Sequence, residues 1–100
     1  MSAFEVFPSL STRLEAAQAI GWGVLVDGYL TDAAVVGDVY AASLYFDHSR
    51  RIPDGTTVVT PPVRSIRQDS GFTLLRSLCG KDHYVVVTEF GGLLNETSEV

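Results

Sequence analysis

One segment near the N-terminus repeats its apolar residues at the period of an α-helix. Four of them recur at spacings of four and three and would form a single stripe: Leu10, Leu14, Ala17 and Ile20. Thr12 and Glu15 fit a capping box, and Ser9 and Ser11 are alternative N-caps. Gly21 stands where a glycine commonly ends a helix. The pattern predicts one short helix, which must pack on other elements because so few turns are not stable alone.

The rest of the chain consists of short apolar or alternating runs between turn residues, which is typical of β-strands. The predicted strands cover residues 22–30, 33–46, 56–60 continued by 63–67, 72–78 and 83–90. Gly37 and Asp38 interrupt the second run. Pro61 and Pro62 bend the third, because a proline has no N–H for a strand ladder.

These elements predict an α+β fold, with one N-terminal helix packed on a five- or six-stranded curved antiparallel sheet or small barrel. A chain of 100 residues has the size of one domain, which we expect to occupy residues 1–90. Residues 91–100 begin with two glycines and continue with polar residues. They predict a flexible C-terminal tail.

A tight turn at Pro53-Asp54-Gly55 precedes the third strand. Proline presets its own φ, and glycine accepts the positive φ that ends such turns. The five residues 56–60 are all β-branched and suit a half-buried strand. We therefore expect Gly55 to take a left-handed conformation and to matter for stability.

The run 33–46 has apolar side chains on both of its faces. Strand alternation places Tyr40 on one face and Tyr45 on the other. Burial within the domain is one explanation. The other is contact with a partner or with a second copy in a symmetric homodimer, since tyrosine is enriched at interfaces. In that case Tyr40 or Tyr45 contributes to the contact together with the neighbouring Asp47 and Arg50.

Composition restricts the classes of function. Apolar residues make up 46% of the chain, which suits a compact globule. The net charge of −5 disfavours nonspecific binding to nucleic acid or membranes and leaves a basic protein partner open. Cys79 is the only cysteine, which suits a reducing compartment. The first residues lack the pattern of a signal peptide, and no apolar run is long enough for a membrane span. We expect a cytoplasmic protein.

No group of residues has the spacing of a catalytic or metal site. His48 and His83 are the only histidines and lack the short spacing of zinc ligands. Residues 47–51 read Asp-His-Ser-Arg-Arg, but adjacent loop residues rarely reach the geometry of a nucleophile and its base. A solvated loop is the favoured interpretation. We therefore expect a non-enzymatic protein without a cofactor or metal.

Five of the seven basic residues lie between positions 50 and 76: Arg50, Arg51, Arg64, Arg67 and Arg76. A hairpin of 63–67 with 72–77 would bring Arg64 and Arg76 together, depending on its register. Such a patch can recognise phosphate or an acidic protein surface. Arginines that merely keep an edge strand soluble are the other interpretation. A nucleic-acid or nucleotide-binding module is therefore the alternative function.

A turn-and-strand signature lies in the middle of the chain. Residues 45–47 read Tyr-Phe-Asp, and residues 51–63 read Arg-Ile-Pro-Asp-Gly-Thr-Thr-Val-Val-Thr-Pro-Pro-Val. This resembles small uncharacterised bacteriophage and prophage proteins, whose pattern is Arg-aromatic-x-Asp-Gly-x-x-Val-x-Thr-Ser-x-Val. Ile52 and Pro61 depart from that pattern, and the likeness runs from residue 45 to 87.

The resemblance implies a fold and a phage or prophage genome as the source of the chain. It assigns no catalytic residue. Short acidic phage proteins of this kind often bind a host protein complex, and anti-CRISPR and other anti-defence inhibitors are examples. The expectation is therefore a phage-encoded module in the host cytoplasm that inhibits a defence complex by covering its surface.

Overall fold

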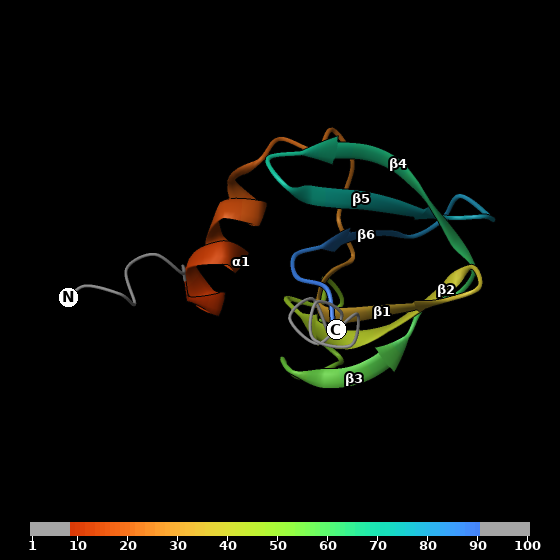
Figure 1. Ribbon diagram of the computed structural model, residues 1–100, viewed down its shortest axis with the longest axis horizontal. Coiled ribbons are helices and arrows are strands. Elements are labelled where there is room, and N and C mark those ends of the chain that lie inside the picture. Colours follow the sequence, from red (N-terminus) through yellow and green to blue (C-terminus); the bar gives the residue numbers. More distant parts are fainter. Residues whose placement is uncertain (1–8, 91–100) are drawn as a thin grey trace, which may run out of the picture.

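A computed structural model of the chain describes residues 9–90, which form one helix and six strands (Figure 1). The elements are α1 (Leu10–Ala19), β1 (Gly28–Val36), β2 (Val39–Tyr45), β3 (Thr56–Val59), β4 (Val63–Asp69), β5 (Phe72–Ser77) and β6 (His83–Val86). The expected tail at 91–100 lies outside the described residues, as do residues 1–8.

The six strands form one sheet in the order β3-β2-β1-β6-β5-β4. Each half of the sheet is an antiparallel meander of three consecutive strands, β1 to β3 and β4 to β6. The two meanders meet where β1 pairs in parallel with β6. The predicted fold class, one helix on a curved sheet, is confirmed. The sheet is open and mixed, because β1 and β6 run in the same direction.

Several of the expected strands differ from the observed ones, and the run 83–90 is a strand only as far as Val86. The run 22–30 becomes a strand only from Gly28, and β1 then continues to Val36. The run 33–46 is a hairpin, in which Val36 pairs with Val39 across a turn at Gly37 with φ 63°. The apolar character of that run reflects two adjacent inner strands of the sheet, although Val35 and Val36 at the hairpin are exposed.

The double proline separates two strands that the sequence suggested were one bent strand. β3 lies at one edge of the sheet and β4 at the other, and only residues 60–62 lie between them. Val63 N donates to Asp38 O (2.8 Å), and Leu78 N donates to Pro62 O (2.9 Å). The sheet therefore curls enough for this link to pass from one edge strand to the other, as Figure 1 shows.

The N-cap of α1 is Ser9, whose Oγ accepts from Thr12 N (3.2 Å). The expected capping box of Thr12 and Glu15 is therefore wrong, and the alternative cap at Ser9 is right. Thr12 lies at the third helical position, where its Oγ1 also contacts Ser9 Oγ (2.9 Å). Ile20 ends the helix in an extended conformation.

Apolar side chains form a core cluster on each face of the sheet. The first core cluster lies under α1 and contains Leu14, Ala17, Trp22, Tyr29, Phe72, Leu74, Val85 and Val87. The second contains Leu30, Ala33, Ala42, Leu44, Val63, Leu75 and Val86. The second cluster receives side chains from both edge strands, Val58 of β3 and Val63 of β4. Its face is therefore the inside of the curl.

Trp22 attaches the helix to the sheet. Its indole Nε1 donates to Ala17 O (3.0 Å), and its ring is buried in the first core cluster. The Arg67 guanidinium lies over the ring at 5.1 Å and donates to Gly21 O (3.1 Å) and Trp22 O (3.2 Å). Arg67 also pairs with Asp69 at 2.8 Å. One end of β4 thus holds the segment that follows α1.

Candidate functional site

The loop at residues 46–55, which joins β2 to β3, contains two of the four non-glycine residues that have positive φ in the described part of the chain. Phe46 and Arg50 have φ angles of 58° and 63°, in a left-handed region that side chains other than glycine rarely occupy. Gly55 closes the loop with φ 89°, which confirms its predicted left-handed conformation. Strained backbone of this kind persists only where surrounding contacts enforce it, and it is concentrated at functional sites.

The carboxylate of Asp47 fixes the first half of the loop. Its Oδ2 accepts from Ser49 Oγ (2.6 Å), Arg51 N (2.9 Å) and Ile52 N (3.0 Å). The hydrogen bond from the Ser49 hydroxyl, aided by backbone amides and opposed by desolvation, lowers the pKa of Asp47 below its ordinary value. Asp47 therefore stabilises the conformation of the loop from within, through these three hydrogen bonds.

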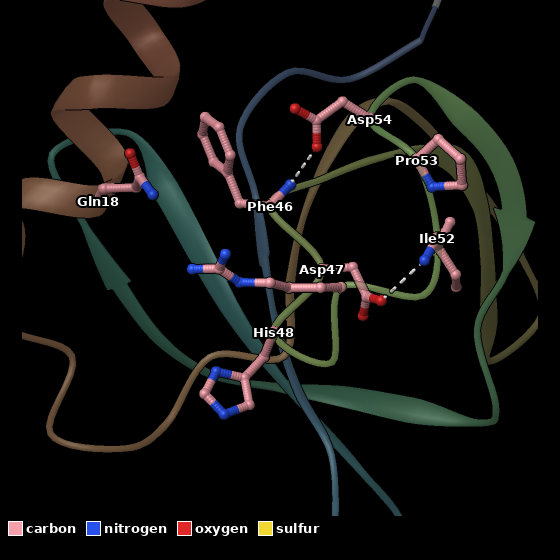
Figure 2. Close-up of a pocket in the computed structure, with 8 residues that line it drawn as sticks. Gln18, Phe46, Asp47, His48, Ile52, Pro53 and Asp54 are labelled. Carbon is pink, nitrogen blue, oxygen red and sulfur yellow. Dashed lines mark hydrogen bonds between the residues drawn. The ribbon is translucent and has the colours of Figure 1, made fainter.

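The second half of the loop is held to β2 and to the start of β1. Asp54 Oδ1 accepts from Phe46 N (2.8 Å), as Figure 2 shows, and Gly55 N donates to Leu44 O (2.7 Å). His48 N donates to Asp27 O (2.9 Å) in the segment that leads into β1. Both ends and the middle of the loop are thus fixed by hydrogen bonds.

Replacing Gly55 by valine is expected to lower the free energy of unfolding by about 1–3 kcal/mol, because a β-branched residue is strained at positive φ. Gly55→Asn is the matched variant, since asparagine tolerates left-handed backbone, and it should lose less. Urea denaturation of both variants measures the difference. Equal losses would mean that the φ of 89° is not the source of the effect.

Stability should depend on the ionisation of Asp47 at acid pH. Because folding lowers its pKa, Asp47 contributes stability that is fully present above its unfolded pKa of about 4 and is lost as the pH falls through the lower folded value. The excess stability of the parent over Asp47→Asn should therefore be largest near neutral pH and shrink on acidification. Thermal melts of both proteins across the acid range measure it, and a constant difference would contradict the assignment.

A pocket of about 520 Å³ opens beside the loop. It is lined by Gln18, Phe46, Asp47, His48, Arg50, Ile52, Pro53 and Asp54, and Figure 2 shows Gln18 of α1 across from Phe46. Phe46 is 38% exposed although it is aromatic, and it contacts Tyr29 and Tyr45 edge-on with ring centroids 6.0 and 6.3 Å away. The loop thus displays an aromatic ring and the exposed Arg50 at the rim of this pocket, here called the loop pocket.

A second pocket of about 430 Å³ lies on the inner side of the curled sheet, between the loop, β3 and the start of β6. Apolar side chains of Leu44, Ile52 and Val58 line part of it. Three carboxylates also line it, from Asp27, Asp47 and Asp82, and neither arginine nor lysine does. We call it the acidic groove.

The acidic groove is also lined by Tyr84 of β6, whose pKa is affected by the surrounding carboxylates. Desolvation, followed by the negative charges of Asp82, Asp27 and Asp47, raises the pKa of the Tyr84 phenol to about 12. The parallel β1–β6 pair assembles these groups, because Gly28 lies opposite Tyr84 and His83 N donates to Asp27 Oδ2 (2.8 Å). The groove is therefore electronegative and partly shielded from solvent.

The structure brings four of the eight predicted partner-binding residues together on one side of the sheet. Tyr45 ends β2 against the first core cluster, and Asp47, Arg50 and Arg51 follow it in the loop. Tyr40 lies near the other end of β2, where it is half-buried against the second core cluster.

The other three predicted residues lie on the opposite half of the sheet, away from the loop. Arg64 of β4 faces Arg76 of β5 in the ladder, which is one of the arrangements that the sequence left open. Arg67 is already engaged with the Trp22 ring, two backbone carbonyls and Asp69. The three arginines therefore do not form one free patch.

Sequence reasoning missed several residues of the site: Asp27, Phe46, Asp54, Asp82 and Tyr84. The Pro-Asp-Gly turn signal marked Asp54 as a turn residue, although its hydrogen bond to Phe46 N depends on the whole loop. Asp27 and Asp82 carry no local signal, because only the nonlocal pairing of β1 with β6 brings their segments together.

Among residues 9–90, no three His, Cys, Asp or Glu side chains are placed so that they could hold a metal ion. The helix in this part of the chain is too short and polar to cross a bilayer. Comparisons with family models, curated proteins and solved structures each find no match to the chain. The loop and its two pockets are therefore the features from which a function can be inferred.

Proposed function

We propose that the chain is a non-enzymatic protein-binding module and that the 46–55 loop is its recognition element. The observation that carries the proposal is the left-handed backbone at Phe46 and Arg50, held by Asp47 and Asp54. A loop fixed before binding loses little conformational entropy when a partner arrives. Left-handed backbone at two non-glycine residues costs conformational free energy. We attribute its retention to the binding role of the two side chains.

The displayed side chains are of the types that dominate binding energy at protein interfaces. Aromatic residues and arginine are enriched among residues whose truncation is most costly. Phe46 is backed by Tyr29 and Tyr45, so its ring is exposed at the edge of a fixed aromatic group. The adjacent loop pocket gives a partner side chain a recess beside this ring.

The test uses substitutions that keep the left-handed backbone while they remove the side chains. Phe46→Asn with Arg50→Asn preserves a residue that tolerates positive φ at both positions. Arg64→Gln, at an exposed position on β4, is the matched control. Each protein is used as bait in a bacterial lysate, with a melt to verify folding. A protein retained by the parent and the control and lost by the folded loop variant supports the proposal; retention by all three contradicts it.

The specific form of the proposal is inhibition of a host defence complex by a phage-encoded protein, which rests on the resemblance of residues 45–87 to small phage proteins. Expression of the chain in bacteria with an active CRISPR system should restore plaque formation by a targeted phage. The loop variant should lose this effect and the Arg64→Gln control should keep it. Unchanged plaque counts with the parent would exclude that CRISPR system as the target, and other defence systems are tested in the same way.

Nucleic acid is not expected to be the main ligand. The net charge of −5 opposes approach to a polyanion, and Arg67 is occupied within the chain. Gel shifts with single- and double-stranded DNA and RNA at about 0.15 M salt should show no complex at micromolar protein. A complex that weakens steeply with salt and is lost in Arg64→Glu with Arg76→Glu would establish the arginine alternative.

A further inference from the structure

The two edges of the sheet are protected to different degrees. The β4 edge carries Arg64 and Arg67 and a bulge between Ser65 and Arg67, which are devices that discourage pairing with another strand. The β3 edge reads Thr-Thr-Val-Val, without a charge or a bulge, and Val59 is 67% exposed. Within residues 9–90, β3 pairs only with β2. It therefore presents an unprotected edge.

The ladder register defines which backbone groups are free. Thr60 N donates to Tyr40 O (2.9 Å), so the alternation of an antiparallel ladder directs the amide of Val58 toward β2, while Thr56 N donates to Pro53 O (3.2 Å) in the preceding turn. The N–H and C=O groups of Thr57 and Val59 then point away from the sheet. Gly55 at one end and Pro61 at the other limit this open edge to a short segment.

The surfaces on either side of this edge have different chemistry. On the inner side, Val58, Val59 and Thr60 line the acidic groove with its three carboxylates. On the outer side, Thr57 lines a shallow, mainly apolar recess of about 330 Å³ with Ala34, Ala41 and Ser43. Side chains of an added strand would alternate between these two surfaces.

We propose that an extended segment of a partner protein adds to β3 as a new edge strand, with basic side chains at alternate positions that enter the acidic groove. This inference deepens the proposed protein-binding function and rests on it. The partner backbone binds the free groups of Thr57 and Val59, and its other side chains, small or β-branched, lie over the outer recess. Main-chain bonds supply affinity and the alternating side chains supply specificity in this mode of recognition.

Charge complementarity selects this occupant over a second copy of the chain. The three carboxylates of the acidic groove have no arginine or lysine among the groove's lining residues. A β3 strand from another copy is uncharged and would leave them without a counter-charge. A lysine or arginine chain instead places its methylenes on Leu44, Ile52 and Val58 and its cation among the carboxylates.

The experiment uses the full chain and synthetic probes with a fluorescent label. The first probe is a nine-residue peptide in which lysine and valine alternate, the second has the same composition in two blocks, and the third has glutamate for lysine. Fluorescence anisotropy should show that the alternating lysine peptide binds about tenfold or more tightly than the other two. Equal binding of the alternating and block peptides would mean that only the total charge of the peptide matters, and it would overturn the proposal.

Backbone pairing is tested without changing the protein. Two versions of the alternating peptide carry N-methyl groups on opposite sets of amides, of which only one set can face β3. One version should bind about tenfold more weakly than the other. Amide hydrogen exchange at Thr57 and Val59 should slow when the unmethylated peptide is present. Binding without this protection places the peptide elsewhere and refutes strand addition.

Charge variants test the groove. Asp82→Asn should weaken binding of the alternating lysine peptide severalfold and reduce its salt dependence, whereas Glu15→Gln, at an exposed acid on α1 outside both surfaces, should change neither. Equal effects of both variants would mean that only the net charge of the protein attracts the peptide.

Self-association is measured by sedimentation. If it slows hydrogen exchange at the amides of Thr57 and Val59, the edge is assigned to a second copy. Failure of every peptide alongside loop-dependent capture of a lysate protein would remove this inference and leave the proposed function standing.

Discussion

Replacement of Trp22 by alanine is expected to lower the free energy of unfolding by about 3–5 kcal/mol. The indole is only 6% exposed, packs in the first core cluster and donates to Ala17 O. Its ring is also the surface over which Arg67 lies. Since Leu14 and Ala17 are the two buried residues of α1, the helix has few other attachments to the sheet.

Urea denaturation followed by circular dichroism measures this loss, because Trp22 is the only tryptophan of the chain and both variants lack its fluorescence. Trp22→Phe is the matched variant: it keeps an aromatic ring in the core but removes the N–H donor, so it should lose less than Trp22→Ala. If Trp22→Ala retained parental stability, the interaction of α1 with the sheet would depend on other contacts. If the two variants lost the same amount, the hydrogen bond to Ala17 O would carry the effect.

Replacement of Leu75 by alanine is expected to cost about 2–5 kcal/mol of unfolding free energy, through lost burial and the cavity left behind. Leu75 is 0% exposed and packs on the inside of the curl in the second core cluster. Leu78→Ala is a close control, because the same side chain three residues later is 60% exposed. It should change stability by no more than about 0.5 kcal/mol.

Thermal or urea melts of the two leucine variants separate burial from residue type. A comparable loss in both would show that the inside of the curl is not the stabilising core. Partial melting in Leu75→Ala with α1 retained would show that the two core clusters unfold independently.

The fold class could be predicted because it depends on local patterns. The apolar period of α1, the β-branched run at 56–60 and the turn at Gly55 each contain their own signal within a few residues. The register of the 63–77 hairpin stayed open at the sequence level: the two-residue loop at 70–71 alone would place Arg64 opposite Ser77, and the bulge between Ser65 and Arg67 places it opposite Arg76. The hairpin turn at Gly37 was visible as a break, but an apolar run of that length did not distinguish one long strand from two buried ones.

Nonlocal pairing could not be predicted. The parallel contact of β1 with β6 joins segments more than fifty residues apart and creates the acidic groove. No local property of Asp27 or Asp82 indicates that they lie together. The left-handed backbone at Phe46 and Arg50 was also invisible, because the carboxylates that hold it form hydrogen bonds only in the folded loop.

The division of the sheet into two meanders has a consequence for assembly. Each meander contains only sequence-local pairings, so it can form early, and the β1–β6 contact forms only when the two meanders meet. Residues 60–62 are the one backbone connection between the two meanders, and a short hinge of this kind favours exchange of a unit between two copies. At high concentration, the β4–β6 meander of one molecule can therefore complete the β1 edge of another. Refolding at increasing concentration should yield an exchanged dimer that keeps every strand pair of the monomer.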